Sequence, residues 1–322
     1  MERNYSIWER RWVGTERQNH PWLEQSDDSQ ATGCVQLVFT QSVHTFLIAA
    51  GTSGSVKHMS GVSLSLDEKV VLITGGSRGI GAECVRLFRE AGAKVAFNYR
   101  AARSQAEALA AECGGAGACI SIEQELSSAE DGRALVTKAI EAFGRLDCLV
   151  VNHGIWPPDD VPISSMTEAQ WRNTLGINLD SVFGLVQAAV AQMQKQGRSA
   201  DGTASGHIVL VSSTAGQRGE AFHSDYAVTK GAVISLTKSL SSELAREGIY
   251  VNCVAPGWVA TEMSAPALND PATRKNIFGA IPLGRVATPK EIAGPILFLC
   301  TPFAGFMSGE IVNVNGGAVL VG

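Results

Sequence analysis

A glycine-rich loop most constrains the fold of this chain. The loop, Thr-Gly-Gly-Ser-Arg-Gly-Ile-Gly at residues 74–81, follows a short apolar run at residues 69–74 and precedes a segment of helical spacing at residues 81–91. Its glycines allow a tight turn, a close approach of backbone to a pyrophosphate, and close packing of helix on strand. Such a loop is a weak signal alone, but the strand before it and the helix after it predict dinucleotide binding.

The rest of the chain alternates short apolar runs with helical segments. We predict strands at residues 93–97, 118–123, 146–151, 206–211, 250–255 and 310–314, and helices at residues 104–113, 129–143, 167–194, 226–246 and 289–299. This alternation predicts βαβ units with right-handed crossovers. We therefore expect an α/β fold with a doubly wound parallel sheet, forming a single Rossmann-type domain over residues 65–322.

Residues 1–64 differ in character from the rest. They hold Trp8, Trp12 and Trp22, an acidic patch at residues 24–28, and an interrupted apolar run at residues 35–51. That run is too polar for a membrane span, and the acidic residues argue against a signal or transit peptide. We expect a disordered extension, with Met59 as a natural start of the domain; a docking or targeting arm is the alternative.

The net charge and the cysteine content indicate which binding partners and which cellular compartment to expect. The net charge is −5 and no run of Lys or Arg stands out, so we expect neither nucleic acid nor an anionic membrane as a partner. The seven cysteines form no C-x-x-C pair. We predict free thiols in a cytoplasmic protein, and no metal site.

Three side chains predict catalysis. Tyr226 and Lys230 are four residues apart in a helical segment and share a face, and Ser213 follows the apolar run at residues 206–211. An ammonium beside a phenol lowers the phenol's pKa, so Tyr226 would exchange a proton with a carbonyl or alcohol oxygen. The alternative is a surface pair with no chemistry; the position of Ser213 favours catalysis.

The end of the second strand bears on the cofactor. An acid there would bind the ribose 2′-hydroxyl and repel a 2′-phosphate, but Asn98, Tyr99 and Arg100 stand here. Arg100 and Arg78 offer two guanidinium groups, which suit a phosphate. We favour NADP(H), with NAD(H) as the alternative if these arginines are only solvated surface residues.

Taken together, these motifs resemble the short-chain dehydrogenase/reductase family in its compact form. Thr74, Gly75, Gly79 and Gly81 match the family's T-G-x-x-x-G-x-G loop, Ser213, Tyr226 and Lys230 its catalytic residues, and Asn178 its helix asparagine. The match covers roughly residues 65–322. It implies that Ser213 binds the substrate oxygen, that Lys230 also holds the nicotinamide ribose, and that Asn178 anchors a water in a proton relay.

The resemblance also implies the cofactor contacts. Pro256 and Gly257 would turn the chain beside the nicotinamide, and Thr261 would hold its carboxamide. Further expected contacts come from Ser77, Arg78, Ile80, Tyr99, Arg100, Glu125, Leu126, Asn152, Gly154 and Val259, and from Tyr226 and Lys230. The sequence departs from the family's pattern at two places on the cofactor side: Val151-Asn152-His153-Gly154 replaces the family's N-N-A-G, and Glu125 replaces its usual aspartate.

The substrate is the least constrained part. Residues 261–285 are rich in apolar side chains and correspond to the family's mobile flap, which excludes water from the reaction. Trp156, Trp258, His153 and His223 are candidates for the mouth of the site. Within the family, the sequence motifs resemble most those of β-ketoacyl-acyl-carrier-protein reductases. We therefore expect a small carbonyl or alcohol substrate, with a 3-oxoacyl thioester carried by acyl carrier protein as a candidate.

Other functions stay open. The substrate could be a sugar, a polyol or a steroid-like molecule, and a non-catalytic nucleotide-sensing protein is a further alternative. Because members of the family are commonly tetramers built on two long helices, here residues 167–194 and 226–246, we expect a homotetramer or a dimer.

Overall fold

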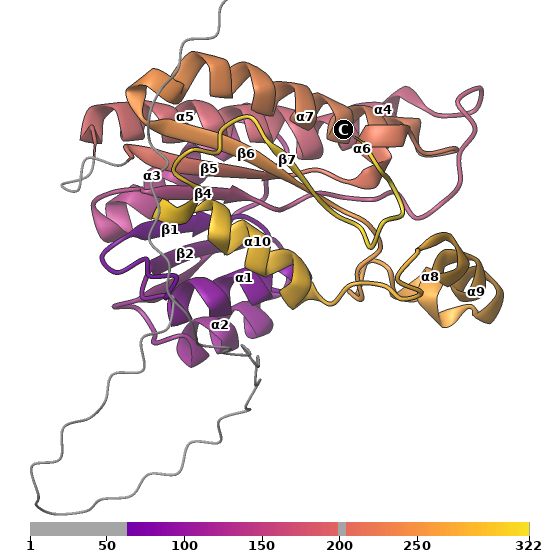
Figure 1. Cartoon of the computed structure of the whole chain (residues 1–322), viewed down its shortest axis with the longest axis horizontal. Coiled ribbons are helices and arrows are strands. Elements are labelled where there is room, and N and C mark those ends of the chain that lie inside the picture. The colour runs from indigo at the N-terminus through magenta and orange to yellow at the C-terminus, as the bar shows by residue number, and fades with distance from the viewer. Residues whose placement is uncertain (1–62, 199–203, 322) are drawn as a thin grey trace, which may run out of the picture. The chain divides into compact units, whose positions relative to one another are not determined.

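The computed structural model describes residues 63–198 and 204–321, so the predicted extension lies outside the described residues except at residues 63 and 64. Figure 1 shows alternating strands and helices. In chain order they are β1 (Val70–Ile73), α1 (Gly79–Glu90), β2 (Lys94–Tyr99), α2 (Arg103–Glu112), β3 (Cys119–Glu123), α3 (Ala129–Phe143), β4 (Cys148–Val151), α4 (Glu168–Leu175), η1 (Gly176–Asp180), α5 (Ser181–Gln196), β5 (Gly206–Val211), α6 (Thr214–Arg218), α7 (Ser224–Leu244), η2 (Ala245–Glu247), β6 (Ile249–Pro256), α8 (Ala265–Asn269), α9 (Pro271–Ala280), α10 (Pro289–Leu299), η3 (Pro302–Ala304) and β7 (Ile311–Val314).

The seven strands form one parallel sheet in the order β3-β2-β1-β4-β5-β6-β7. Val71 of β1 aligns with Val95 of β2 on one side and with Cys148 of β4 on the other. The strand order therefore reverses direction at β1, and ligands bind such sheets at the carboxyl ends of the strands beside this switch point. The predicted doubly wound, Rossmann-type fold is confirmed.

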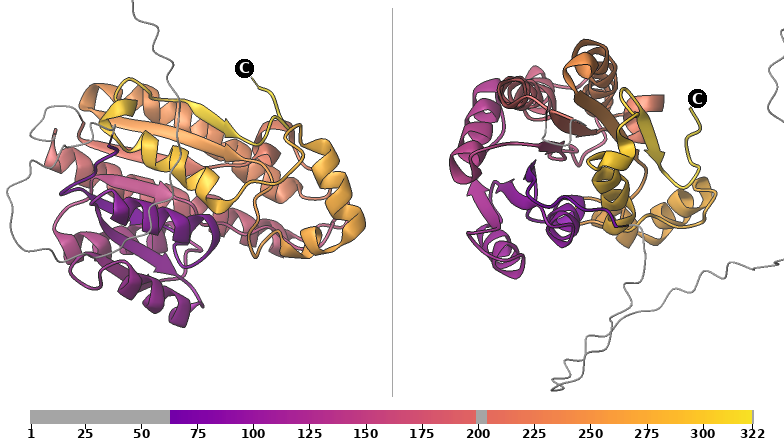
Figure 2. Two further views of the ribbon diagram at one scale, coloured as in Figure 1. Left: turned by 60° about the horizontal axis from the view of Figure 1, so that its bottom comes forward. Right: turned by 60° about the vertical axis from the view of Figure 1, so that its left-hand side comes forward.

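Helices cover both faces of the sheet (Figures 1 and 2). Successive side chains of a strand point to opposite faces. In β1, Val71 and Ile73 enter the core formed with α1, α2 and α10, whereas Leu72 enters the core formed with α3, α5 and α7. Burial on both faces explains why the strands read as continuous apolar runs rather than as alternating ones.

Capping explains why two helices begin where the sequence predicts. Ser128 accepts a hydrogen bond from the backbone N–H of Asp131 at the start of α3. At the start of α10, Thr288 and Glu291 form a capping box and Pro289 occupies the first turn. Both helices have the predicted bounds, residues 129–143 and 289–299.

The long helix predicted at residues 167–194 is interrupted. It consists of α4, the π-helical turn η1 and α5. The Ser181 hydroxyl donates to the carbonyl of Ile177 at 2.7 Å, within this irregular stretch. Single π-helical turns occur frequently at functional sites, and this one carries Asn178.

The same stretch, Glu168–Gln196, is the one helical segment among the described residues that is long and apolar enough to span a membrane. More than half of its most apolar window is buried. Leu185, Ala189 and Met193 of α5 belong to the core on the face of the sheet that α3, α5 and α7 cover, and α5 packs there against α3. It packs as a core helix of this domain.

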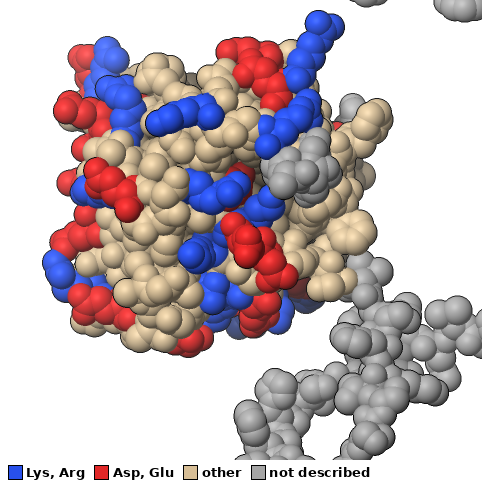
Figure 3. Space-filling view, turned by 90° about the vertical axis from the view of Figure 1, so that its left-hand side faces the viewer, with Lys and Arg blue, Asp and Glu red and all other residues tan. Residues whose placement is uncertain are grey.

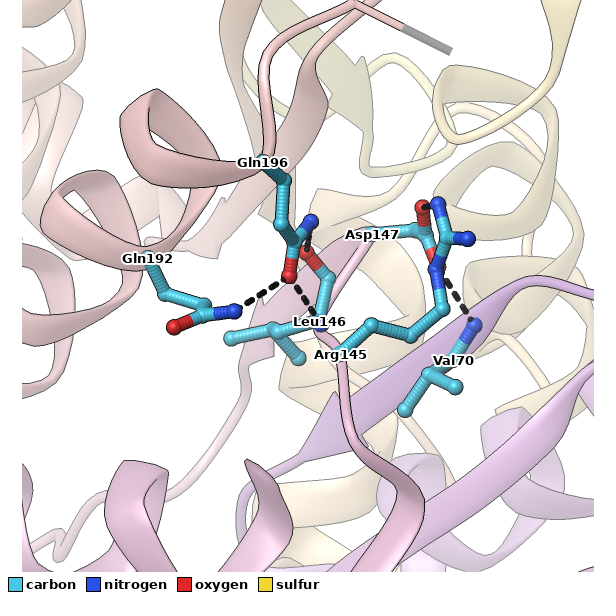
Figure 4. Close-up of polar contacts among 6 residues, drawn as sticks. All are labelled: Val70, Arg145, Leu146, Asp147, Gln192 and Gln196. Carbon is cyan, nitrogen blue, oxygen red and sulfur yellow. Dashed lines mark hydrogen bonds and ion pairs between the residues drawn. The ribbon is translucent and has the colours of Figure 1, made fainter. Parts of the chain in front are cut away.

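Polar contacts join the amino-terminal edge of β1 and β4 to the end of α5 (Figure 4). Asp147 accepts from the Val70 N–H at 2.9 Å and pairs with Arg145 at 2.6 Å. The Gln196 side chain bonds both the N–H and the carbonyl of Leu146, at 2.8 and 2.9 Å. Gln192 in turn donates to the Gln196 side-chain carbonyl. These contacts satisfy backbone groups at the edge opposite the carboxyl ends of the strands.

The described cysteines are free thiols, and all of them except Cys113 are buried. On the face that Figure 3 shows, basic and acidic side chains are interspersed over the surface. In residues 63–198 and 204–321, no group of three or more His, Cys, Asp or Glu side chains is placed to hold a metal ion.

Candidate active site

The glycine loop follows β1 and wraps the start of α1. Gly75 has a φ of 64°, a conformation that favours glycine, and its N–H donates to the Asn98 side chain at 2.8 Å. A Cβ atom on Gly81 would lie 2.1 Å from the Gly75 carbonyl oxygen, so the turn admits only glycine there. No side chain caps α1 at Arg78, which leaves its first N–H groups available to an anionic ligand.

A cavity of about 730 Å³ opens beside this loop. Many of the predicted cofactor residues line it: Gly75, Ser77, Arg78, Gly79, Ile80, Tyr99, Arg100, Glu125, Leu126, Asn152, Gly154 and Thr261. The other predicted contacts are not in its lining: Thr74, Gly81, Tyr226, Lys230, Pro256, Gly257 and Val259. Of these, Thr74, Gly81, Lys230, Pro256 and Val259 are buried. Gly257 packs against Asn315.

The two arginines predicted to bind a phosphate each face a carboxylate. Arg78 pairs with Glu262 at 2.7 Å, and Arg100 lies 3.9 Å from Glu125. All four side chains are more than half exposed, so the pairs contribute little to stability. Arg78 is thus engaged by the chain after β6, while Arg100 is held only loosely.

Ser213, Tyr226 and Lys230 come together at the carboxyl end of β5. Ser213 begins the short helix α6, where its hydroxyl accepts from the Ala215 N–H at 3.1 Å. The Lys230 ammonium is buried, donates to the Val211 carbonyl at 2.8 Å, and lies 5.7 Å from the centre of the Tyr226 ring. The Ser212 hydroxyl donates to the Lys230 carbonyl at 2.7 Å and so ties α7 to the strand end.

The electrostatics of this group correct one prediction. Burial raises the pKa of Tyr226 to about 12, although a hydrogen bond with Ser213 acts in the opposite direction. Burial lowers the pKa of Lys230 to about 8. The prediction that Lys230 lowers the Tyr226 pKa is wrong for the chain by itself, because removal of the phenol from water dominates.

Asn178 is buried on η1 and holds the loop after β4. Its side-chain carbonyl accepts from the Ile155 N–H at 2.8 Å, and its amide donates to the Ile155 carbonyl at 2.9 Å and to the Thr229 hydroxyl at 3.3 Å. An asparagine oxygen has two lone pairs, so one acceptor position is left for a further partner. A Cβ on Gly154 would lie 3.2 Å from this oxygen and 3.5 Å from the Lys230 ammonium.

His153, proposed above for the mouth of the site, lines the cavity and also joins the glycine loop to η1. Its Nδ1 lies 2.8 Å from the Thr74 hydroxyl and its Nε2 lies 2.8 Å from the Ser181 hydroxyl. The Ser181 hydroxyl donates to Ile177, so it accepts from Nε2–H. The ring is therefore a neutral tautomer that accepts at Nδ1 from Thr74. Removal from water lowers its pKa to about 3.

Asp225 directly precedes Tyr226, the predicted catalytic tyrosine, and sequence reasoning missed it. This fully buried carboxylate accepts from the Thr174 hydroxyl at 2.8 Å, the Gln170 amide at 3.2 Å and the Tyr226 N–H at 2.9 Å. A carboxylate in the first turn of α7 also suits the helix dipole. It ties α4 to the start of α7. Its position beside Tyr226 was the available sequence signal.

Trp156 lies against Tyr226. The ring centres of Trp156 and Tyr226 are 4.7 Å apart at an angle of 72°, and those of Trp156 and His223 are 4.0 Å apart. Trp156 also lines the cavity beside the glycine loop. It is thus the residue that connects this cavity with Tyr226.

The predicted flap contains two short helices, α8 and α9, beyond the carboxyl end of the sheet (Figure 1). Asp270 caps α9 by accepting from the Thr273 N–H at 2.7 Å. The flap buries Ile277 and Ile281, while Met263 and Leu283 are more than half exposed. The helices were not predicted because their five and ten residues are too short for a clear period.

A family model described as enoyl-(acyl carrier protein) reductase matches residues 75–319 of this chain. The chain belongs to the short-chain dehydrogenase/reductase family. It is therefore an NAD(P)-dependent dehydrogenase or reductase, as the glycine loop and the Ser213, Tyr226 and Lys230 group predict.

Relatives within this short-chain dehydrogenase/reductase family differ in substrate. The chain is 36% identical to 3-oxoacyl-(acyl-carrier-protein) reductase FabG of Staphylococcus aureus over 77% of this chain and 97% of that one. It is 35% identical to L-rhamnose 1-dehydrogenase (NAD(P)(+)) of Azotobacter vinelandii, over 78% of this chain and 97% of that one. The fold is similar to that of a structure described as an NAD(P)-dependent gluconate 5-dehydrogenase from Beutenbergia cavernae, which holds NADP at low occupancy. The TM-score is 0.72 and the sequence identity 30%, over 80% of this chain and 99% of that one.

Proposed function

We propose that this protein uses NADP(H) to transfer a hydride between nicotinamide and a carbonyl or secondary alcohol. The observation that carries the proposal is the grouping of Ser213, Tyr226 and Lys230 at the carboxyl end of β5, next to the cavity that the glycine loop lines. Trp156 touches both parts of this arrangement.

The residues present fit a dinucleotide. A Cβ on Gly81 would clash with the loop, the start of α1 has no side-chain cap, and the cavity lies beside both. Ser77, Gly79 and Ile80 would hold the pyrophosphate, and Asn152 and Thr261 the nicotinamide half. When bound, the nicotinamide gives or accepts the hydride.

The chain's own groups handle the proton and the substrate oxygen. In reduction, Tyr226 donates its phenolic proton to the carbonyl oxygen; a pKa of about 12 keeps that proton in place at neutral pH. Ser213 donates a hydrogen bond to the same oxygen and stabilises the charge that develops there. Asn178 is a positioning residue that holds Ile155, and its free acceptor position suits a water in a relay toward Lys230.

Arg100 is the residue that we propose for NADP preference. It lines the cavity, it is only loosely paired with Glu125, and no acid follows β2 to repel a 2′-phosphate. The NADP in the gluconate dehydrogenase neighbour supports this proposal. A guanidinium also binds phosphate through two parallel hydrogen bonds.

Two substrate classes follow from the comparisons. The FabG relative supports a 3-oxoacyl thioester carried by acyl carrier protein, and the exposed apolar side chains of Met263 and Leu283 would contact its acyl chain. The L-rhamnose dehydrogenase relative supports a sugar or polyol. Both classes use the same proton chemistry at Tyr226.

We also propose that residues 65–322 form the catalytic unit of a cytoplasmic homotetramer. Phe183 on α5 and Val228 on α7 are about half exposed, as apolar residues of a helix-to-helix subunit interface would be in a single copy. Size-exclusion chromatography with light scattering tests the assembly.

The function is tested with Tyr226→Phe. This change removes only the phenolic oxygen, so we expect a loss of turnover of about 100- to 10,000-fold with NADPH binding retained. The control is NADPH fluorescence titration of both proteins. A Tyr226→Phe protein as active as the wild type would instead favour a nucleotide-binding protein without catalysis.

A further inference from the structure

Trp156 stands between the cavity beside the glycine loop and the predicted catalytic tyrosine. Its side chain is part of the lining of that cavity. Its ring also meets the Tyr226 ring edge to face, with the ring centres 4.7 Å apart and an angle of 72° between the planes. A substrate whose carbonyl oxygen lies at the Tyr226 hydroxyl would therefore lie against Trp156.

The neighbours of Trp156 fix the position of its ring. Asn178 bonds both the N–H and the carbonyl of the preceding residue, Ile155, at 2.8 and 2.9 Å. The following residue, Pro157, restricts the backbone of Trp156 to extended conformations. The His223 ring lies against the indole, with the ring centres 4.0 Å apart. The indole is thus a preformed part of the cavity wall.

The one polar atom of this indole has no partner. An indole N–H is a hydrogen-bond donor and never an acceptor. In residues 63–198 and 204–321, no group accepts a hydrogen bond from Nε1 of Trp156. Nor is this atom enclosed, in contrast to the buried, unpartnered Nδ1 of His223. A ligand that covers this donor without accepting its hydrogen bond leaves the donor unsatisfied, which is unfavourable.

The indole N–H is an additional donor beside the group that binds the reacting oxygen. In the proposed reaction, the Tyr226 and Ser213 hydroxyls both bind that oxygen, so the N–H of Trp156 is left for a second one. A sugar carries such an oxygen on the neighbouring carbon, and a 3-oxoacyl thioester carries one on the carbon after next. A simple ketone carries neither and would cover the donor without a bond.

Resting on the proposed function, we propose that Trp156 is a specificity-determining residue whose indole N–H binds a second oxygen of the substrate, close to the reacting carbon. The inference assigns the substrate to carbonyl compounds with a second oxygen acceptor, together with the corresponding alcohols. It also predicts that simple ketones are poor substrates.

The test compares NADPH-dependent reduction of three carbonyl compounds by the wild type and by Trp156→Phe. Butanone has no second oxygen, acetoin has one on the neighbouring carbon, and ethyl acetoacetate has one on the carbon after next. We expect the wild type to prefer an oxygenated compound over butanone by about tenfold or more in kcat/KM. Preference for acetoin would indicate a sugar-like substrate, and preference for ethyl acetoacetate a 3-oxoacyl compound.

Trp156→Phe keeps an aromatic ring against Tyr226 and removes the N–H. In this variant kcat/KM for the preferred oxygenated compound should fall about tenfold more than that for butanone. Comparison of the two proteins cancels the intrinsic reactivities of the compounds. The Kd for NADPH, measured by fluorescence titration, should equal that of the wild type.

Trp171→Phe is the matched control. Trp171 on α4 is also a partly buried tryptophan, but it does not line this cavity. Its variant should keep the wild-type preference, and melting curves verify that each variant folds.

Equal preference in wild type and Trp156→Phe would overturn the inference, as would a wild type that reduces butanone as well as the oxygenated compounds. A raised Kd for NADPH with an equal loss for all three compounds would also overturn it, because the indole would then serve the cofactor. In each case the oxidoreductase function would stand. Absence of NADPH oxidation with every carbonyl compound would overturn the proposed function itself.

Discussion

Nδ1 of His153 lies 2.8 Å from the hydroxyl of Thr74, so the residue that replaces the family's alanine after β4 bonds the residue that begins the glycine loop. The same ring donates to Ser181 beside η1. His153 therefore couples the cofactor loop to the turn that carries Asn178, and its effect on binding can be tested separately from catalysis.

His153→Ala should weaken NADPH binding. The change removes both hydrogen bonds of the ring and leaves the Ser181 and Thr74 hydroxyls without this partner. We expect a loss of about 1–3 kcal/mol, divided between the free energy of unfolding and the free energy of NADPH binding. We expect a roughly tenfold higher Kd for NADPH, measured by fluorescence titration. Ser181→Ala removes only one of the two bonds and should have a smaller effect; an unchanged Kd in His153→Ala would show that the ring only fills space.

Arg100→Asp should change cofactor preference. Reversing the charge removes the guanidinium and places an acid where a 2′-phosphate would bind, so NADPH affinity should fall about 10- to 100-fold more than NADH affinity. Arg103→Asp is the control, because Arg103 is as exposed as Arg100 but does not line the cavity. An equal effect of Arg100→Asp on both cofactors would refute the phosphate contact.

The two reaction directions should differ in their pH dependence. With a pKa of about 12, Tyr226 holds its proton at neutral pH, so it is ready to act as an acid in reduction. Alcohol oxidation needs the phenolate, whose fraction rises about tenfold per pH unit below the pKa. We expect kcat/KM for oxidation to rise steeply between pH 7 and 9, while that for reduction stays nearly level up to about pH 7 and falls around pH 8, where half of the Lys230 ammonium has lost its proton. A kcat/KM for alcohol oxidation that stays constant between pH 7 and 9 would contradict the assignment of Tyr226 as the proton acceptor.

Acid should destabilise the fold through its buried histidines. Removal from water lowers the pKa of His207 to about 4 and that of His153 to about 3, both below the ordinary 6.5. The unfolded chain then binds more protons than the folded one, so the free energy of unfolding falls as pH drops below about 6.5. Each histidine contributes a slope of about 1.4 kcal/mol per pH unit until its folded pKa is reached.

Urea denaturation at pH 7 and pH 5 measures this effect. His207→Gln removes one of the two contributions and should therefore lose less stability between these pH values than the wild type. A wild-type stability that rises toward pH 5 would contradict the two lowered pKa values.

Local sequence determined the fold class, the strands and most helix bounds. Strands buried on both faces appear as apolar runs, caps such as Ser128 and Thr288 mark helix starts, and the glycine loop requires backbone that only glycine adopts. Ser213, Tyr226 and Lys230 were recognisable because fixed spacings on a strand end and a helix place them together.

Tertiary structure decided what depends on residues far apart in the chain. His153 meets Thr74 and Ser181, Trp156 meets Tyr226, and Asp225 meets Thr174 only because the sheet order brings their elements to one edge. The pKa of Tyr226 was mispredicted for the same reason. Spacing shows that a lysine is near, but the extent of burial, which dominates the shift, is set by the packing of the whole domain.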